Sequence, residues 1–204
     1  MDPAYKSHLL RSDDAFDSLY SMTWREHSPK HWTPVRVGVI ASRWLTEDPH
    51  VDRVLDVGSG VGKLCIVGAL ATGRTFVGVE QRPALTAAAA AAVQAAGVSS
   101  RVRLLCARAT LPLLSEFRAI YLYNPFAEHT SAPTSRIDDA VELSFKRYKE
   151  DVALVEEALR RAPVGQRVVT FHGFGGEMPR GYVEEHCEPV GNDLLQLWVK
   201  HLAL

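Results

Sequence analysis

Residues 56–62, DVGSGVG, place three glycines close together behind a carboxylate. Glycine lets a backbone turn sharply and approach a ligand where a Cβ atom would collide with it. Glu80 ends the next β-branched run of the chain, and a carboxylate there can accept hydrogen bonds from both hydroxyls of a ribose. Ligands of open α/β sheets bind at the carboxyl ends of strands. We therefore expect the glycine turn and Glu80 to form one nucleoside pocket.

Three other interpretations of the glycine turn fit less well. A phosphate-binding P-loop would need glycine in place of Val57 and Ser or Thr in place of Leu64. A dinucleotide fingerprint would place its third glycine where Lys63 stands, and a lysine would crowd a pyrophosphate. A turn without a ligand would not explain Glu80. Asp56 adds negative charge, which suits a cofactor with an ammonium group and no phosphates.

Strand-like runs alternate with helix-like segments around this turn. The expected strands are residues 53–58, 75–80, 101–106, 118–123 and 166–172, followed by two more strands joined by Gly191-Asn192-Asp193. The expected helices are residues 35–45 with Thr33 as N-cap, 61–71, 83–96 and 138–161. This alternation predicts an α/β fold, a Rossmann-like doubly wound sheet of seven mostly parallel strands with a C-terminal antiparallel hairpin. Residues 1–32 should form a helical cap of one or two short helices, and residues 33–204 the cofactor-binding domain.

Composition narrows the environment and the partners. The net charge of -1 gives no general basic surface, so no nucleic-acid partner is expected. The N-terminal residues lack a secretion-signal pattern, and no apolar run is long enough to cross a membrane. Three scattered cysteines indicate a reducing compartment, which makes the cytoplasm the expected location. The dispersed histidines predict no metal site.

The motif VLDVGSGVGK, followed by TFVGVEQRP, resembles the class I S-adenosylmethionine-dependent methyltransferases. The resemblance covers about residues 33–201, through the seven-stranded order with its terminal hairpin. GSGVG with GVE also resembles the non-SET histone-lysine methyltransferases locally, and HWTP, YLYNPF and HGFGG are similar to segments of small bacterial methyltransferases. The resemblance implies S-adenosylmethionine as the cofactor.

By this resemblance, Asp56 and the glycine loop hold the amino-acid part of the cofactor, Glu80 the ribose, and Gln81 lies against the adenine. The family often has an acidic residue after the third strand, where this chain has Arg108. Either the backbone around Ala109 reads the adenine, or Arg108 stacks on it. The residues expected to bind the cofactor are Thr33, Asp56, Gly58, Ser59, Gly60, Gly62, Glu80, Gln81, Arg108, Ala109 and Asn124.

Two strand ends carry the expected catalytic residues. In amino-directed methyltransferases, a turn similar to Asn124-Pro125-Phe126 accepts N–H hydrogen bonds through the Asn side chain and the Pro carbonyl. Its aromatic ring stacks on a planar substrate or stabilises positive charge. Those enzymes usually carry a second proline, which is absent here, so a strand-ending turn with Phe126 in the core is an equal alternative. His172, after the fifth strand, is either a general base or a structural histidine.

The remaining expectations concern the acceptor. Loop residues 124–136 are expected to form part of a lid over it, and the residues expected to bind it are Trp32, Phe126, His129, Tyr148 and His172. The leading hypothesis is methyl transfer to a nitrogen, in preference to an oxygen, of a small molecule or peptide. An NAD-dependent oxidoreductase is one alternative, against which Lys63 argues. A non-catalytic nucleoside-binding module is another, left open by Arg108 and the incomplete Asn-Pro motif.

Overall fold

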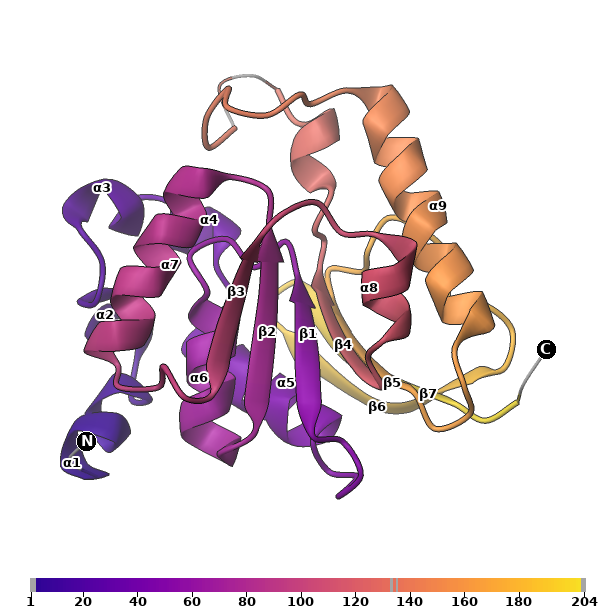
Figure 1. Cartoon of the computed structure of the whole chain (residues 1–204), viewed down its shortest axis with the longest axis horizontal. Helices are drawn as coiled ribbons and strands as arrows, with labels where there is room; N and C mark the ends of the chain where they lie inside the picture. Colours follow the sequence, from indigo (N-terminus) through magenta and orange to yellow (C-terminus); the bar gives the residue numbers. More distant parts are fainter. Residues whose placement is uncertain (1–2, 133, 135, 203–204) are drawn as a thin grey trace.

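Seven strands form one sheet in the order β3-β2-β1-β4-β5-β7-β6 (Figure 1). The computed structural model describes residues 3–132, 134 and 136–202, so the ends of both expected domains, residues 1–2 and 203–204, lie outside the described residues. The parallel strands are β1 (Arg53–Val57), β2 (Thr75–Glu80), β3 (Val102–Cys106), β4 (Ala119–Tyr123) and β5 (Arg167–Phe171). β6 (Tyr182–Val190) and β7 (Asp193–Lys200) form the antiparallel hairpin. The expected fold class is confirmed.

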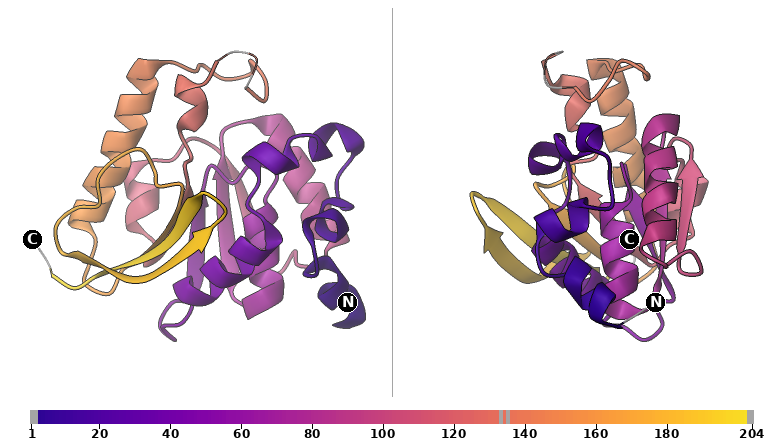
Figure 2. Two further views of the ribbon diagram at one scale, coloured as in Figure 1. Left: turned by 180° about the vertical axis from the view of Figure 1, so that it is seen from behind. Right: turned by 90° about the vertical axis from the view of Figure 1, so that its left-hand side faces the viewer.

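Helices cover both faces of the sheet, which explains why its central strands are largely buried. Every residue of β5 is buried, as are four of the five residues of β1. One hydrophobic core joins the sheet to α5 (Val35–Leu45), α6 (Lys63–Thr72) and α7 (Pro83–Ala95). A second core joins the other face to α8 (Leu111–Ser115) and α9 (Phe145–Arg161), and Figure 2 shows the two layers from further sides. None of the described helices is long and apolar enough to span a bilayer.

The helix expected from Asp138 begins later, at Phe145, so that prediction was wrong. Ser144 is the true N-cap, because its side chain accepts a hydrogen bond from the backbone N–H of Arg147. Asp138 accepts hydrogen bonds from Ala140 N and from the Arg82 guanidinium instead. The connection from β4 to α9 is therefore longer than expected, and its described part includes the short 3₁₀ helix η1 (Ala127–Thr130).

Residues 3–32 form four short helices, where the sequence predicted one or two. They are α1 (Pro3–Leu9), α2 (Asp13–Asp17), α3 (Met22–Arg25) and α4 (Ser28–His31). We call this segment the N-terminal cap. The buried Tyr20 hydroxyl donates a hydrogen bond to the Val61 carbonyl, 3.0 Å away, in the glycine turn. The cap is thus attached to the loop that the sequence singled out.

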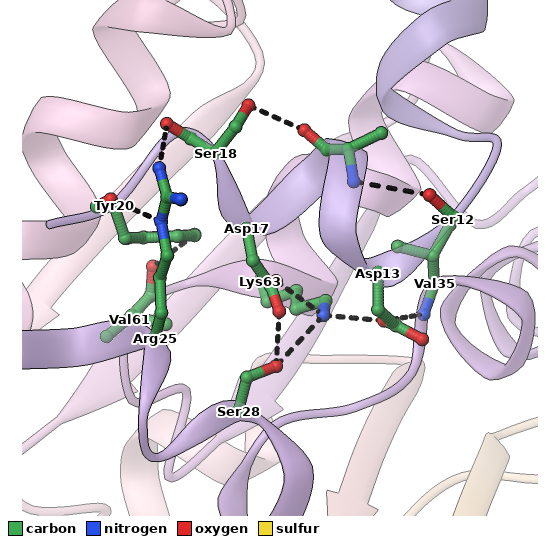
Figure 3. A network of polar contacts seen from close by, with 11 residues as sticks. Ser12, Asp13, Asp17, Ser18, Tyr20, Arg25, Ser28, Val35, Val61 and Lys63 are labelled. Carbon is green, nitrogen blue, oxygen red and sulfur yellow. Dashed lines mark hydrogen bonds and ion pairs between the residues drawn. The ribbon is translucent and has the colours of Figure 1, made fainter. Parts of the chain in front are cut away.

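A buried lysine makes the second attachment (Figure 3). Lys63 Nζ lies 2.6 Å from Asp13 Oδ1 and 2.7 Å from Asp17 Oδ1, and the Lys63 side chain is only 3% exposed. Ser28 donates to the other oxygen of Asp17. This placement corrects one argument from the sequence: the Lys63 side chain points into the cap and does not crowd a ligand at the glycine turn.

The same cluster corrects the expected cap of α5. Thr33 does not cap that helix, because its hydroxyl pairs with the Tyr121 hydroxyl at 3.0 Å. Asp13 Oδ1 accepts the hydrogen bond from Val35 N at 2.8 Å in its place. A carboxylate is the better partner for a helix start, because it is negative where the helix dipole is positive. One aspartate therefore serves Lys63 and α5 together.

We expect Lys63→Met to lower the free energy of unfolding by about 3 kcal/mol, because Asp17 is then buried without its counter-charge. Adding Asp17→Asn to this variant should recover part of the loss. Urea unfolding followed by circular dichroism measures both. As a control, Lys146→Met removes the exposed Lys146–Glu150 pair and should change the value by less than about 0.5 kcal/mol. Equal losses in the two lysine variants would contradict the prediction.

Candidate functional site

The glycine turn leaves β1 with a backbone that few side chains tolerate. Gly58 and Gly60 have φ of +71° and +53°, in the left-handed region that favours glycine. The N–H groups of Gly58 and Ser59 donate to the Val79 carbonyl at 2.9 and 3.0 Å, which ties the turn to β2. A Cβ atom added to Gly60 would meet no atom within 4 Å. The turn therefore presents bare backbone at Gly60 to open space.

Glu80, at the end of β2, is directed to this turn. Its Oε2 accepts a hydrogen bond from Gly60 N at 3.1 Å, and its Oε1 accepts one from Arg82 N at 2.8 Å. Burial raises the pKa of Glu80, while these two hydrogen bonds and the charge of Arg82 oppose that rise. The two segments that the sequence assigned to one nucleoside pocket do lie together.

A cavity of about 240 Å³ opens at the carboxyl ends of the parallel strands. The expected site residues that line it come from the ends of all five parallel strands and from the cap. They are Trp32, Gly58, Gly60, Glu80, Gln81, Arg108, Ala109, Asn124, Pro125, Phe126 and His172. In Figure 1 the arrows of β1 and β2 point to this edge of the sheet, beside the chain that leads from β4 to α9. The topology thus gathers residues that are far apart in sequence.

Other expected cofactor residues lie behind the cavity rather than in its lining, namely Thr33, Asp56, Ser59 and Gly62. Asp56 is 4% exposed, and the Cys65 thiol donates to its Oδ2 over 3.6 Å. Burial raises the pKa of Asp56 to about 7; the Cys65 hydrogen bond lowers it and the charge of Glu80 raises it further. Asp56 is therefore a buried carboxylate that is bonded to α6, the helix after the turn.

Two residues expected at the acceptor also lie outside the cavity lining: His129 is bonded within the β4–α9 connection, and Tyr148 is bonded to the segment after β5. His129 Nε2 is 3.3 Å from Asp151 Oδ2, and its Nδ1 accepts a hydrogen bond from Ser144 N. Burial lowers the pKa of His129, against the opposing effect of Asp151. The Tyr148 hydroxyl donates to the Gly175 carbonyl at 3.2 Å. Both side chains are therefore used to fix neighbouring backbone.

Several lining residues were missed by the sequence analysis. Asp151, from α9, reaches the cavity and lies 2.7 Å from the Arg108 guanidinium. The Arg82 side chain is 5% exposed and forms ion pairs with Glu128 and Asp138, which hold the connection over the cavity. No local pattern signals these pairs, because each joins segments far apart in the chain. The other missed lining residues are Lys30, Val57, Val79, Leu85, Ala107, Ala127 and Ile137.

Comparison with known proteins connects this geometry to one fold. Residues 35–115, less than half of the chain, match the family model of protein-L-isoaspartate(D-aspartate) O-methyltransferase. No curated protein sequence matches the chain. An RNA methyltransferase from Salinibacter ruber, solved with S-adenosyl-L-homocysteine, has a TM-score of 0.54 and 20% identity over 81% of this chain and 92% of its own.

Two further solved structures share the architecture. An O-methyltransferase family protein from Burkholderia thailandensis has a TM-score of 0.56 and 14% identity, over 94% of this chain and 60% of its own. The C-terminal domain of precorrin-6Y C5,15-methyltransferase from Rhodobacter capsulatus has a TM-score of 0.51 and 16% identity, over 84% of this chain and 91% of its own. The chain has the methyltransferase fold.

Within this methyltransferase fold, two strand ends adopt uncommon backbone. Asn124 after β4 and His172 after β5 have φ of +36° and +57°, which are the positive values among non-glycine residues of the described chain. Asn124 N donates to the Gly173 carbonyl at 3.0 Å, so the two ends are bonded to each other. Backbone strain of this kind concentrates at functional sites, where the surrounding structure holds it in place.

The raised pKa of Asp56 predicts how stability depends on pH. An aspartate in an unfolded chain has a pKa of about 3.9, whereas the pKa of folded Asp56 is about 7. The folded state therefore binds this proton more tightly. The stability gained from protonated Asp56 is complete below about pH 4. It decreases as the pH rises to 7, by up to about 1.4 kcal/mol per pH unit.

We expect Asp56→Asn to remove this dependence, because an amide carries no charge into the buried site. The free energy of unfolding of the variant, relative to wild type, should rise between pH 5 and pH 8 in urea titrations. Asp52→Asn, at an exposed position four residues earlier, is the matched control and should show no such trend. If the free energy of unfolding of Asp56→Asn, relative to wild type, stays constant with pH, the raised pKa of Asp56 would be contradicted.

Proposed function

We propose that the chain is an S-adenosylmethionine-dependent methyltransferase that binds its cofactor in the cavity at the glycine turn. The observation that carries this proposal is the Glu80 carboxylate, which bonds to Gly60 N and also lines the cavity. Each carboxylate oxygen has a second lone-pair direction beyond its one backbone bond, which suits the two hydroxyls of a ribose. The match of residues 35–115 to a methyltransferase family supports the same cofactor.

The charges around the cavity favour a cofactor without phosphates. Its two arginines, Arg82 and Arg108, are paired with Glu128 and Asp138 and with Asp151, respectively. Dinucleotide sites place a pyrophosphate at the glycine turn. Here Glu80 borders that turn and adds negative charge, so the alternative of an NAD-dependent oxidoreductase is disfavoured on grounds that do not involve Lys63.

We assign the cofactor's parts to residues as follows. Glu80 binds the ribose, Gln81 lies beside the adenine, and the bare backbone at Gly60 admits the cofactor where a side chain would fill the space. Asp151 supplies the carboxylate that the third strand lacks, since Arg108 holds it at the cavity. When bound, S-adenosylmethionine supplies an electrophilic methyl group on a sulfonium sulfur.

We propose that the acceptor atom is a nitrogen of a small molecule or peptide, in preference to an oxygen. Asn124, Pro125 and Phe126 all line the cavity. The Asn124 amide oxygen and the Pro125 carbonyl are acceptors suited to N–H groups, whereas Phe126 is mostly buried in the second core, 7% exposed. The net charge of -1 favours a compact acceptor over RNA, although one similar structure is an RNA methyltransferase.

Isothermal titration calorimetry tests the cofactor. We expect wild type to bind S-adenosylhomocysteine with a micromolar Kd. Glu80→Ala should weaken binding about 100-fold, because two charge-assisted hydrogen bonds to the ribose are each worth about 1.5 kcal/mol. Gly60→Arg should abolish binding, because its side chain fills the cavity.

The matched control is Glu116→Ala. The Glu116 side chain is 57% exposed, and this variant should bind the cofactor like wild type. Circular dichroism establishes that each variant is folded. Normal affinity in both Glu80→Ala and Gly60→Arg, or an enhancement of NADH fluorescence on mixing with wild type, would overturn the proposed function.

A further inference from the structure

A second cavity, of about 960 Å³, adjoins the first. It lies between the N-terminal cap, the ends of β4 and β5, and the turn that joins β6 to β7. Four residues line both cavities: Lys30, Trp32, Tyr123 and His172. A volume of this size is within the range of small-molecule sites. The shared residues mark the place where contents of the two cavities would meet.

His172 stands at this boundary with a carboxylate behind it. Its Nδ1 is 2.8 Å from Asp193 Oδ1, and Asp193 is the first residue of β7, after the hairpin turn. A carboxylate at Nδ1 fixes the orientation and tautomer of an imidazole and leaves Nε2 as the proton acceptor. The left-handed backbone of His172 shows that the fold holds this side chain in place against a local preference.

The walls of the second cavity suit a planar cation. Trp32, Tyr123 and Phe171 supply aromatic surface, and the Tyr123 ring centroid is 5.2 Å from that of His172. Asp14 and Asp193 supply negative charge, beside the positive charges of Arg25 and Lys30. Aromatic faces attract cations as well as stacking on planar rings. An aromatic ring that carries an alkylammonium group satisfies both features.

We propose that His172 is the general base of the methyl transfer, positioned by Asp193, and that the second cavity binds the acceptor, a compact arylalkylamine that arrives as an ammonium ion. This inference rests on the proposed function and names the acceptor class of that same site. Asp193 is a positioning residue, because it acts through the imidazole. The cap contributes Trp32 to the wall, which gives the N-terminal helices a part in acceptor binding.

The proposed step balances as follows. His172 Nε2 takes one proton from the ammonium group, which leaves a neutral amine with a lone pair. That lone pair forms the bond to the methyl carbon while the carbon–sulfur bond breaks and its electrons return to sulfur. The products are a methylated ammonium ion, S-adenosylhomocysteine and a protonated His172, which releases its proton to water.

The test is an assay of tritiated S-adenosylmethionine with tryptamine and phenethylamine, from pH 6.5 to pH 9. 2-Phenylethanol, which has the same ring and chain as phenethylamine but no ammonium group, is the neutral comparison. For wild type we expect methylation of both amines and not of the alcohol. Because the enzyme itself deprotonates the amine, kcat/KM should be flat above about pH 7.5.

The charged and titratable groups that face His172 come from five elements, and all stay in place during the comparison. They are Asp193 of β7, Tyr123 of β4, Lys30 of α4, Arg25 of α3, and Asp13, Asp14 and Asp17 of α2. Burial raises the pKa of Tyr123, as does the charge of Asp193, so this phenol stays protonated over the whole range of the assay. The shape of the profile therefore reports on the base.

His172→Asn is the decisive variant, because asparagine tolerates the left-handed backbone at this position. We expect kcat/KM at pH 7.5 to fall about 100-fold. It should then rise about tenfold per pH unit, since only amine already deprotonated in solution reacts. Asp193→Asn should lower kcat about tenfold with KM unchanged and keep the flat profile.

The hairpin offers a matched control. His201 and Glu185 form a similar pair, 2.9 Å apart, outside both cavities, so His201→Asn and Glu185→Gln should leave the profile unchanged. A His172→Asn profile parallel to that of wild type would overturn the role as base. Failure of both amines as acceptors, with S-adenosylhomocysteine still bound by wild type, would overturn the acceptor class and leave the proposed function standing. Failure of that binding would overturn the proposed function itself.

Discussion

The buried Glu80 carboxylate is the interaction on which the site depends. It accepts backbone hydrogen bonds from Gly60 and Arg82, and so it fixes the turn after β1 relative to the chain after β2. The bond to Gly60 sets the direction of bare backbone at the cavity, and Arg82 in turn holds the β4–α9 connection through its own ion pairs. A carboxylate has enough lone pairs to do this and still face a ligand. One side chain thereby helps to position both the glycine turn and the β4–α9 connection at the cavity.

The N-terminal cap extends the same organisation to the far side of the turn. Tyr20 bonds to the Val61 carbonyl, and Lys63 is neutralised by Asp13 and Asp17. Because a buried charge is costly without its partner, the cap and the start of α6 stabilise each other. The cap places Trp32 between the two cavities. Four short helices that would be unstable alone are therefore part of the site.

The sequence was sufficient to predict what depends on local pattern. β-branched runs gave the parallel strands, and glycines before a helix, with Glu80 at the next strand end, located the pocket. It was insufficient where a side chain's partner lies far away in the chain. The pairing of Arg108 with Asp151 and the use of Thr33 by Tyr121 both required the fold. The late start of α9 was missed because Asp138 and Ser144 are equally good helix caps, and only tertiary contacts choose between them.

Gly60 differs in kind from the glycines that allow the fold to pack. At Gly68 an added Cβ atom would lie 2.2 Å from the Phe76 ring, so any larger residue would disturb the core itself. At Gly60 such an atom would touch nothing, and the left-handed backbone alone would admit asparagine or aspartate at modest strain. During evolutionary drift, a descendant that no longer binds the ligand would be free to lose Gly60 but not Gly68. Divergence at these two positions would thus separate selection for activity from selection for folding.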